Sequence, residues 1–143
     1  MGFAIKRLQQ TLRSRMDAAL AQYGLTSPQY AVLALLAEHP GISNAELARR
    51  SFVAAPTMLR LLDSLSQAGL ITRAAPSPEQ RARGTVLTTA GKKRLSACSA
   101  HVQELEDLLV AQAGPDHIDV IMSWLHTCAE QLSDRTPAGG SLI

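Results

Sequence analysis

Aromatic residues and cysteines are scarce in this chain. Only five of its 143 residues are Trp, Tyr or Phe, which argues against RNA-binding modules that stack bases on aromatic rings. The two cysteines, Cys98 and Cys128, fall on apolar helix faces, so we expect reduced thiols that pack as small hydrophobic residues. A redox switch is the alternative interpretation of these thiols.

Long apolar runs are also missing. No uncharged apolar stretch reaches the length of a membrane span, and residues 1–6 have neither a signal-peptide core nor a myristoylation pattern. We therefore expect a cytoplasmic protein with no membrane partner. With 143 residues and 46% apolar content, the chain can form one domain with a filled core.

Motifs for catalysis are absent as well. No Gly-x-Ser-x-Gly, Walker loop or dinucleotide-binding fingerprint occurs. None of the four histidines has metal-ligand spacing to a carboxylate or a cysteine: His39, His101, His117 and His126. The sequence therefore predicts no catalytic residue, no metal, no cofactor and no enzymatic activity.

A helix-turn-helix pattern begins at Ser43. The side chain of Ser43 can cap a helix, and Glu46 can reach back to the Ser43 amide, as in a capping box. Leu47 and Ala48 give this helix a small apolar face. Residues 50–54 then predict a turn.

A second helix is predicted over residues 56–67. Its first residue is a proline, which suits a first helical turn. Four apolar residues recur at helical spacing and predict a buried face: Met58, Leu59, Leu62 and Leu65. The opposite face carries Thr57, Arg60 and Ser64. This outward face is the part that would meet a major groove.

A short hairpin follows the second helix. Gly69 suits the helix end, and residues 70–73 and 85–87 predict two short strands. The loop between them carries Arg81 and Arg83 near its tip. A helix, a turn, a helix and a basic hairpin in this order are typical of a winged helix-turn-helix that binds double-stranded DNA.

Charge is distributed unevenly along the chain. Residues 43–94 carry nine basic and three acidic side chains, a net charge of +6, whereas the remainder carries −4, for the total of +2. Because attraction to phosphate depends on the local field, this basic block supports DNA binding better than the total charge does. Ordinary solvated surface charge is the alternative.

The stretch from residue 25 to residue 91 resembles the MarR family of bacterial transcription regulators. The resemblance is carried, in the family's order, by Leu25-Thr26-Ser27-Pro28-Gln29-Tyr30, Glu46-Leu47-Ala48, Leu62-Asp63-Ser64-Leu65, Gly69-Leu70-Ile71-Thr72-Arg73 and Leu87-Thr88-Thr89-Ala90-Gly91. In the wing, the Asp-x-Arg that is usual in the family is replaced by Glu79-Gln80-Arg81. The resemblance implies a dimeric transcription regulator that responds to small phenolic or aromatic acids.

Regular apolar stripes predict three further helices: one ending near Gly24, one that Thr88 or Thr89 caps, and one after Gly114. The stripes consist of Ile5, Leu8, Leu12, Met16, Ala19, Leu20 and Tyr23; of Leu95, Cys98, Val102, Leu105 and Leu109; and of Ile118, Ile121, Met122, Leu125, Ala129 and Leu132. These stripes exceed what the small reading unit needs. They favour a two-fold homodimer, with an ordinary intrachain core as the alternative.

The predicted fold is mainly α with a small β-wing. Residues 1–24 and 95–135 form the helical dimerisation region, residues 25–94 form the winged helix-turn-helix DNA-binding region, and residues 136–143 form a flexible tail. The two reading helices of a dimer would enter successive major grooves of a pseudo-palindromic operator, with half-sites about 10 base pairs apart. We expect such a protein to act as a repressor.

Eight residues are predicted to contact DNA. We expect Thr57 and Arg60 at base edges, and Arg81 and Arg83 in the minor groove. The others lie at helix starts, where phosphate contacts are favourable, or on the outward face of the second helix: Ser43, Asn44, Pro56 and Ser64.

The family resemblance also implies a small-molecule pocket between the dimerising helices and the reading unit. The matching region is bordered by Arg15, Met16, Ala19, Tyr30 and Leu33, which give an apolar wall, one hydroxyl and one candidate anion partner. The alternative is that the apolar residues are plain core and that the arginine is solvated.

Two other functions stay open. A winged helix can serve as a protein-interaction adaptor that binds no DNA. A cysteine-based redox-sensing regulator is the other alternative, although the relatives that sense oxidants carry their cysteine close to the amino terminus, where this chain has none.

Overall fold

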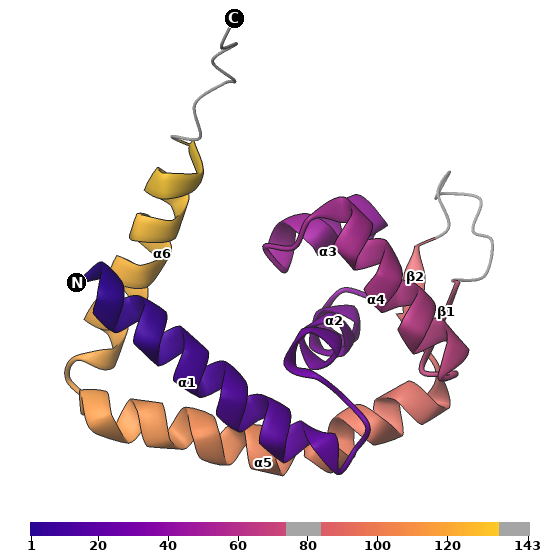
Figure 1. The fold of residues 1–143 in the computed structure, drawn as a ribbon, viewed down its shortest axis with the longest axis horizontal. Coiled ribbons are helices and arrows are strands. Elements are labelled where there is room, and N and C mark those ends of the chain that lie inside the picture. The colour runs from indigo at the N-terminus through magenta and orange to yellow at the C-terminus, as the bar shows by residue number, and fades with distance from the viewer. Residues whose placement is uncertain (74–83, 135–143) are drawn as a thin grey trace, which may run out of the picture. The chain divides into compact units, whose positions relative to one another are not determined.

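The computed structural model describes residues 1–73 and 84–134, which form six helices and two strands (Figure 1). Their bounds are α1 Gly2–Ala21, α2 Ser27–Glu38, α3 Asn44–Arg50, α4 Ala55–Gln67, β1 Ile71–Arg73, β2 Thr85–Leu87, α5 Thr89–Ala113 and α6 Ile118–Asp134. The chain divides into two compact units, Met1–Leu105 and Glu106–Ile143. This mainly helical fold with a two-stranded wing confirms the predicted fold class.

Side-chain hydrogen bonds set the start of α2. Thr26 Oγ1 accepts from Gln29 N at 3.5 Å and Gln29 Oε1 accepts from Thr26 N at 2.9 Å, which completes a capping box. Asp17 of α1 accepts from Ser27 Oγ at 2.6 Å and from Ser27 N at 2.7 Å. These two bonds, the hydroxyl bond first, lower the pKa of Asp17 and tie α1 to α2.

The first helix of the helix-turn-helix begins as predicted, because Ser43 Oγ accepts a hydrogen bond from Glu46 N at 3.2 Å. The prediction that the Ser43 amide donates a reciprocal hydrogen bond to the Glu46 side chain is wrong. The Glu46 carboxylate binds Arg49 and Arg50 instead. Charged donors three and four residues further along the helix make stronger bonds to a carboxylate than a backbone amide does.

The apolar face of α4 packs into the core. Pro56 lies in the first turn, as predicted, and Met58, Leu62 and Leu65 are buried. The assignment of Leu59 to this face is wrong, because its side chain is 52% exposed. Successive helical residues are about 100° apart, so Leu59 lies a quarter-turn from Met58 and outside the buried stripe.

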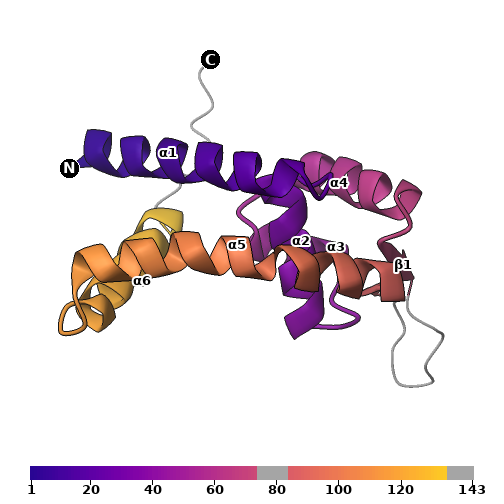
Figure 2. The same ribbon diagram turned by 90° about the horizontal axis from the view of Figure 1, so that it is seen from below.

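The chain passes from α4 into the wing through a short turn (Figure 2). Gly69 has a φ of +70°, and the next amide, Leu70 N, donates to Leu65 O at 3.0 Å. A left-handed glycine followed by this bond is a common way to end a helix. Gly69 therefore ends α4, as the sequence predicts.

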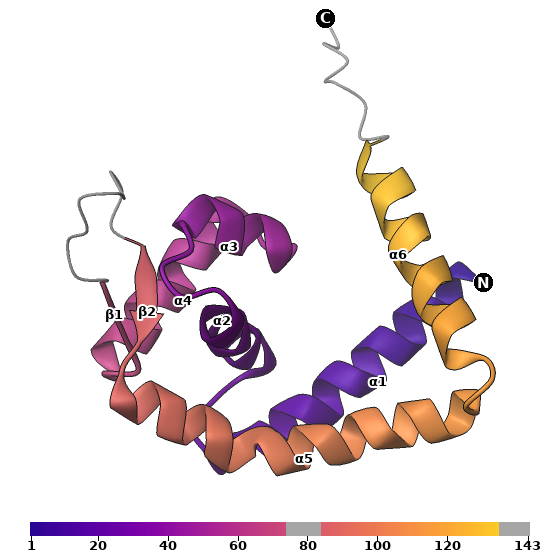
Figure 3. The same ribbon diagram turned by 180° about the vertical axis from the view of Figure 1, so that it is seen from behind.

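The two strands of the wing pair antiparallel, as predicted, with Thr72 opposite Val86 (Figure 3). The loop before α3 lies along the other edge of β2, where Gly41 N donates to Thr85 O at 3.0 Å. The approach is so close that a Cβ atom at Gly84 would lie 1.8 Å from Gly41 O. Glycine is therefore required at position 84.

The start of α5 packs against the base of the wing. Thr88 Oγ1 accepts from Gly91 N at 3.0 Å and donates to Gly69 O at 2.6 Å. The sequence offers Thr88 or Thr89 as the cap of α5, and the bond from Gly91 N identifies Thr88. A Cβ atom at Gly91 would lie 2.0 Å from Leu70 O, so this position also needs glycine.

The core of the first unit is apolar, and α2 lies between the α3–α4 pair and α5 (Figure 1). Its largest fully buried side chains are Leu20, Val32, Leu33, Leu36, Leu47, Met58, Leu65, Leu70 and Cys98. Polar contacts join the end of α1 to α5: Arg94 donates to Tyr23 O at 2.5 Å, and Tyr23 Oη lies 2.9 Å from His101 Nδ1.

The second unit contains the end of α5 and all of α6. Gly114, with a φ of +77°, follows α5. Residues 118–132 of α6 include no buried side chain. The exposed apolar side chains of α6 are Val120, Ile121, Met122, Trp124, Leu125 and Leu132, and those at the start of α1 are Phe3, Ile5 and Leu8. Within residues 1–73 and 84–134, no helix has the length and apolar content that a bilayer crossing requires.

Candidate DNA interface

Thr57 and Arg60 lie on the exposed face of α4. Among the described residues, Arg60 has no hydrogen-bond or ion-pair partner. A guanidinium carries five donors in a planar fork that matches the O6 and N7 acceptors of guanine. This face of α4 can therefore bind base edges, which is the role that the sequence predicts for both residues.

The third predicted residue of this face, Ser64, has a partner on α2. Gln29 Nε2 donates to Ser64 Oγ at 3.0 Å. Because Gln29 also closes the capping box of α2, one side chain sets both the start of α2 and its position against α4. The Ser64 hydroxyl keeps its proton free to donate.

The amino-terminal end of α4 has free amides. Its N-cap, Ala54, offers no side-chain acceptor, and Pro56 has no N–H. The amides of Ala55 and Thr57 precede the first helical bond, which Met58 N makes to Ala54 O at 3.0 Å. Free amides at the positive end of a helix attract phosphate.

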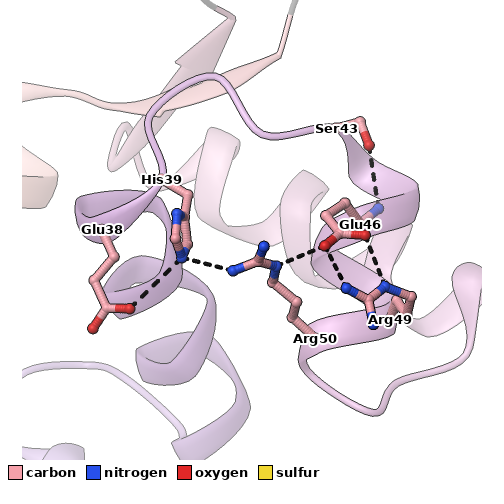
Figure 4. Close-up of polar contacts among 6 residues, drawn as sticks. All are labelled: Glu38, His39, Ser43, Glu46, Arg49 and Arg50. Atoms are coloured by element: carbon pink, nitrogen blue, oxygen red, sulfur yellow. Dashed lines mark hydrogen bonds and ion pairs between the residues drawn. The ribbon is translucent and has the colours of Figure 1, made fainter.

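Both arginines of α3 have hydrogen-bond partners on other side chains of the protein (Figure 4). Arg49 donates to both oxygens of Glu46, from Nε at 2.8 Å and from Nη2 at 2.6 Å. Arg50 Nε donates to Glu46 Oε1 at 2.7 Å, and Arg50 Nη1 lies 2.7 Å from His39 Nε2. A guanidinium only donates, so His39 Nε2 is the acceptor. Glu38 Oε2 lies 3.9 Å from the same nitrogen.

This network lowers the local positive charge. Hydrogen bonds from Arg49 and then from Arg50 lower the pKa of Glu46 to about 2. Glu46 is therefore ionised at neutral pH and offsets one of the two arginine charges. Arg94, which the charge count included, binds a backbone carbonyl inside the fold. The count of +6 already includes Glu46, but Arg49, Arg50 and Arg94 have partners within the protein, whereas Arg60 is an exposed arginine on α4.

Ser43 and Asn44 lie together at the start of α3, both exposed. Ser43 Oγ accepts from the helix, so its own proton remains available to a phosphate oxygen. Asn44 Oδ1 accepts from Thr85 Oγ1 of β2 at 3.4 Å, which leaves the Asn44 amide NH₂ as the outward donor. The start of α3 is thereby joined to the wing.

A groove of about 700 Å³ runs between α3, α4 and the wing. Leu59 and Ser66 of α4 line one wall, and Asn44 of α3 and Arg73 of β1 lie elsewhere on its lining. The exposed Leu59 thus faces this groove rather than the core. Three segments that are distant in the sequence form one surface here.

The wing arginines Arg81 and Arg83, and the predicted tail at residues 136–143, lie outside the described residues. Their predicted roles remain predictions. The strands that flank the loop, β1 and β2, are the part of the wing that the structure describes.

The predicted ligand-pocket residues come together on α1 and α2. Leu33 is fully buried, while Met16 and Tyr30 are partly buried against the same core cluster. Ala19 is half-buried, and Arg15 is exposed. Met16, Tyr30 and Leu33 thus contribute to the core, and the ligand site itself remains a prediction.

Two features of this surface are absent from the sequence analysis. The Glu46–Arg49–Arg50 network follows the i, i+3 and i, i+4 spacing of helical ion pairs, so that spacing was a usable signal. Phe52, in the turn before α4, is 81% exposed and has a φ of +52°. No periodic pattern indicates a left-handed residue at that position.

The fold and this surface define a winged helix-turn-helix protein. Residues 23–83 match the model of the MarR family. The HTH-type transcriptional repressor Rv2887 of Mycobacterium tuberculosis is 32% identical over 112 residues, which cover 78% of this chain and 81% of that protein. The chain belongs to the MarR family. It is a MarR-type DNA-binding transcription regulator, and its relatives are named as transcriptional repressors and regulators.

Solved structures of relatives have the same fold. The transcriptional repressor CouR bound to a 23-mer DNA duplex has a TM-score of 0.78 and 31% identity, with 90% of this chain and 92% of that chain covered. The complex of Rv2887 with salicylic acid has a TM-score of 0.69 and 29% identity, with 90% and 95% covered.

Proposed function

We propose that the protein is a homodimeric repressor whose two α4 helices enter successive major grooves of a pseudo-palindromic operator. The observation that carries this proposal is the exposed face of α4. On it Arg60, which has no partner among residues 1–73 and 84–134, follows a helix start with free amides. The DNA complex of CouR and the name of Rv2887 as a repressor support it. Because its partner is chromosomal DNA, we place the protein in the cytoplasm.

Each predicted contact has a proposed role. Thr57 and Arg60 bind base edges, with Arg60 bidentate to a guanine. Arg81 and Arg83 reach the adjacent minor groove from the wing. Three of the remaining contacts hold the reading helix in register through phosphates: Ser43, Asn44, and Pro56 at the free end of α4. Ser64 lies with Thr57 and Arg60 on the face that meets the major groove.

The dimer is formed by residues 1–24 and 95–135, and residues 25–94 bind DNA. Support comes from the apolar side chains of α6, which are uncovered in the single chain although they recur at helical spacing. Trp124 and Leu125 are each more than one-third exposed. Burial of these side chains against a second copy would stabilise the pair.

We further propose that a small phenolic or aromatic acid releases the operator. The salicylic acid complex of Rv2887 supports a ligand of this class. The site would be bordered by Arg15, Met16, Ala19, Tyr30 and Leu33. A ligand there lowers operator affinity only if it prefers a dimer whose reading helices no longer match the groove spacing.

A redox-sensing function gains no support from the Cys98 thiol. Cys98 is fully buried, and burial raises the pKa of its thiol. The reactive form of cysteine is the thiolate, which these surroundings disfavour.

Arginine 60 offers the direct test of DNA reading. Arg60→Ala should weaken binding to a duplex selected from genomic DNA by about 1 to 3 kcal/mol, because one bidentate base contact is lost, and should change binding to a random duplex little. Fluorescence titrations on both duplexes measure the two losses. Gln67→Ala, at the far end of the same helix, is the matched control and should leave both affinities unchanged.

The salt dependence of these titrations also distinguishes a DNA-binding regulator from a protein-interaction adaptor. A DNA reader binds the selected duplex with an affinity that falls as salt rises, because counterions are released from the phosphates. An adaptor retards no duplex at any salt concentration. Equal losses for Arg60→Ala on both duplexes would remove the base-reading role and leave a phosphate contact.

Calorimetry tests the ligand. Linkage requires that a ligand weaken operator binding by the factor by which the operator weakens ligand binding. A panel of phenolic acids is titrated into free and operator-bound protein. We expect tighter binding to the free form, and equal binding to both forms would contradict release by that ligand.

A further inference from the structure

The turn between α3 and α4 holds a phenylalanine where the chain otherwise uses glycine. Among the described residues, five have a positive φ, and Phe52, at +52°, is the one that is not glycine. The others are Gly24, Gly41, Gly69 and Gly114. A left-handed backbone is strained for any residue with a Cβ atom, and most of all for a bulky one.

The backbone bonds at Phe52 are those of an ordinary helix end. Phe52 N donates to Arg49 O at 3.3 Å, and Val53 N donates to Ala48 O at 3.0 Å. The end of α4 has the same two bonds, with glycine in the equivalent position: Gly69 N to Ser66 O at 2.9 Å and Leu70 N to Leu65 O at 3.0 Å. Glycine is the usual residue there, so the fold would accept it at position 52.

The core does not require the phenyl ring either. Phe52 is 81% exposed, and the next residue, Val53, packs against the core in its place. An apolar contact of that following residue is the usual companion of this helix end. Both the strained backbone and the exposed ring are therefore unfavourable in the free protein. Strained residues that persist in this way gather at functional sites.

The position of Phe52 indicates what covers the ring. It lies two residues before Ala54, the N-cap of α4, and an exposed run, residues 54–57, follows after Val53. In a helix-turn-helix the first helix crosses the DNA backbone and the start of the second enters the major groove. The turn that joins them therefore faces the edge of that groove.

We propose that Phe52 contacts DNA and that its ring packs on apolar atoms at the edge of the major groove. This inference rests on the proposed reading role of α4. The groove edge offers apolar carbon in two forms, the C5-methyl group of thymine and the deoxyribose ring. Contact with either one covers the ring, and the backbone hydrogen bonds of the turn fix the position from which the ring extends.

Replacement by glycine separates this role from a structural one. Phe52→Gly should raise the midpoint of thermal unfolding, because the strain is relieved, and should lower affinity for the selected duplex about tenfold, because apolar burial is lost. The slope of log Kd against log salt should not change, because no charge is removed. Phe52→Leu keeps an apolar side chain and should retain most of the affinity.

A duplex with uracil in place of thymine distinguishes the two forms of apolar carbon. If the ring contacts the thymine methyl group, the loss caused by Phe52→Gly is smaller on this duplex than on the thymine duplex. If the ring contacts deoxyribose, the loss is the same on both. Either result supports a contact between Phe52 and DNA.

Wild-type affinity in Phe52→Gly would overturn the inference. So would a loss of affinity that comes with a lower unfolding midpoint, because the residue would then be structural. These results differ from failure of the proposed function, in which the wild-type protein itself binds no selected duplex.

Discussion

At the scale of the residue, the arginines of the helix-turn-helix differ in their partners. Arg49 and Arg50 are held by one carboxylate, whereas Arg60 has no partner among the described residues. The sequence places all three in one basic block and does not separate them. Only the spacing of Glu46 from the first two arginines indicates that they pair.

Glu46 should give α3 a measurable pH dependence. Its pKa is about 2 in the folded chain against an ordinary value of 4.5, so the unfolded chain binds more protons between these values. The contribution of Glu46 to the free energy of unfolding is therefore complete above about pH 5 and is lost as the pH falls toward 2. Urea unfolding of wild type and Glu46→Gln from pH 2 to pH 6 measures it.

The two proteins should differ most near pH 6 and converge near pH 2. Ser43→Ala is the matched control on the same helix. It removes the cap but no titrating group, so it should cost about 0.5 to 2 kcal/mol at every pH. A constant difference between wild type and Glu46→Gln would mean that the ion pairs do not stabilise α3.

At the scale of the element, the wing depends on two close backbone approaches. A Cβ atom at Gly91 would lie 2.0 Å from Leu70 O, a carbonyl at the base of the wing. Gly91→Ala should therefore destabilise the protein by about 1 to 3 kcal/mol, because the start of α5 must move away from the wing. Denaturant unfolding measures the loss.

Gly2→Ala is the control for this substitution. A Cβ atom at Gly2 meets nothing within 4 Å, and the residue, like Gly91, lies in the first turn of a helix. We expect no loss of stability at that position, because alanine favours a helix more than glycine does. If Gly91→Ala unfolds like wild type, the packing of α5 on the wing is looser than the structure describes.

Helices and strands were the most predictable part of this protein. Helical spacing located the buried Met58, Leu62 and Leu65, and Gly69 marked the end of α4. The error at Leu59 arose because it lies three residues before Leu62, a spacing that also fits an apolar helix face, although its side chain is exposed. Contacts between segments, such as Gln29 with Ser64, could not be predicted, because they depend on how distant helices pack.

At the scale of the whole molecule, the proposed dimer depends on the apolar stripe of α6. Leu125→Asp would place a charge without a partner in that contact and should cost several kcal/mol of association free energy. Sedimentation should then show a monomer, while circular dichroism keeps its helical signal. Thr127→Asp, an exposed position on the same helix, should leave the dimer intact.

If Leu125→Asp stays a stable dimer and its operator affinity is unchanged, the interface does not lie on α6. The sequence could predict the stripe but not its partner. An apolar stripe has the same pattern whether it packs within one chain or against a second copy.

The central claim is that two α4 helices of one dimer bind successive major grooves. Hydroxyl-radical footprinting of the protein on its selected duplex tests this claim most directly. We expect two protected half-sites, related by two-fold symmetry and centred about 10 base pairs apart on one side of the DNA. A single protected patch, or two patches without a common face of the helix, would contradict it.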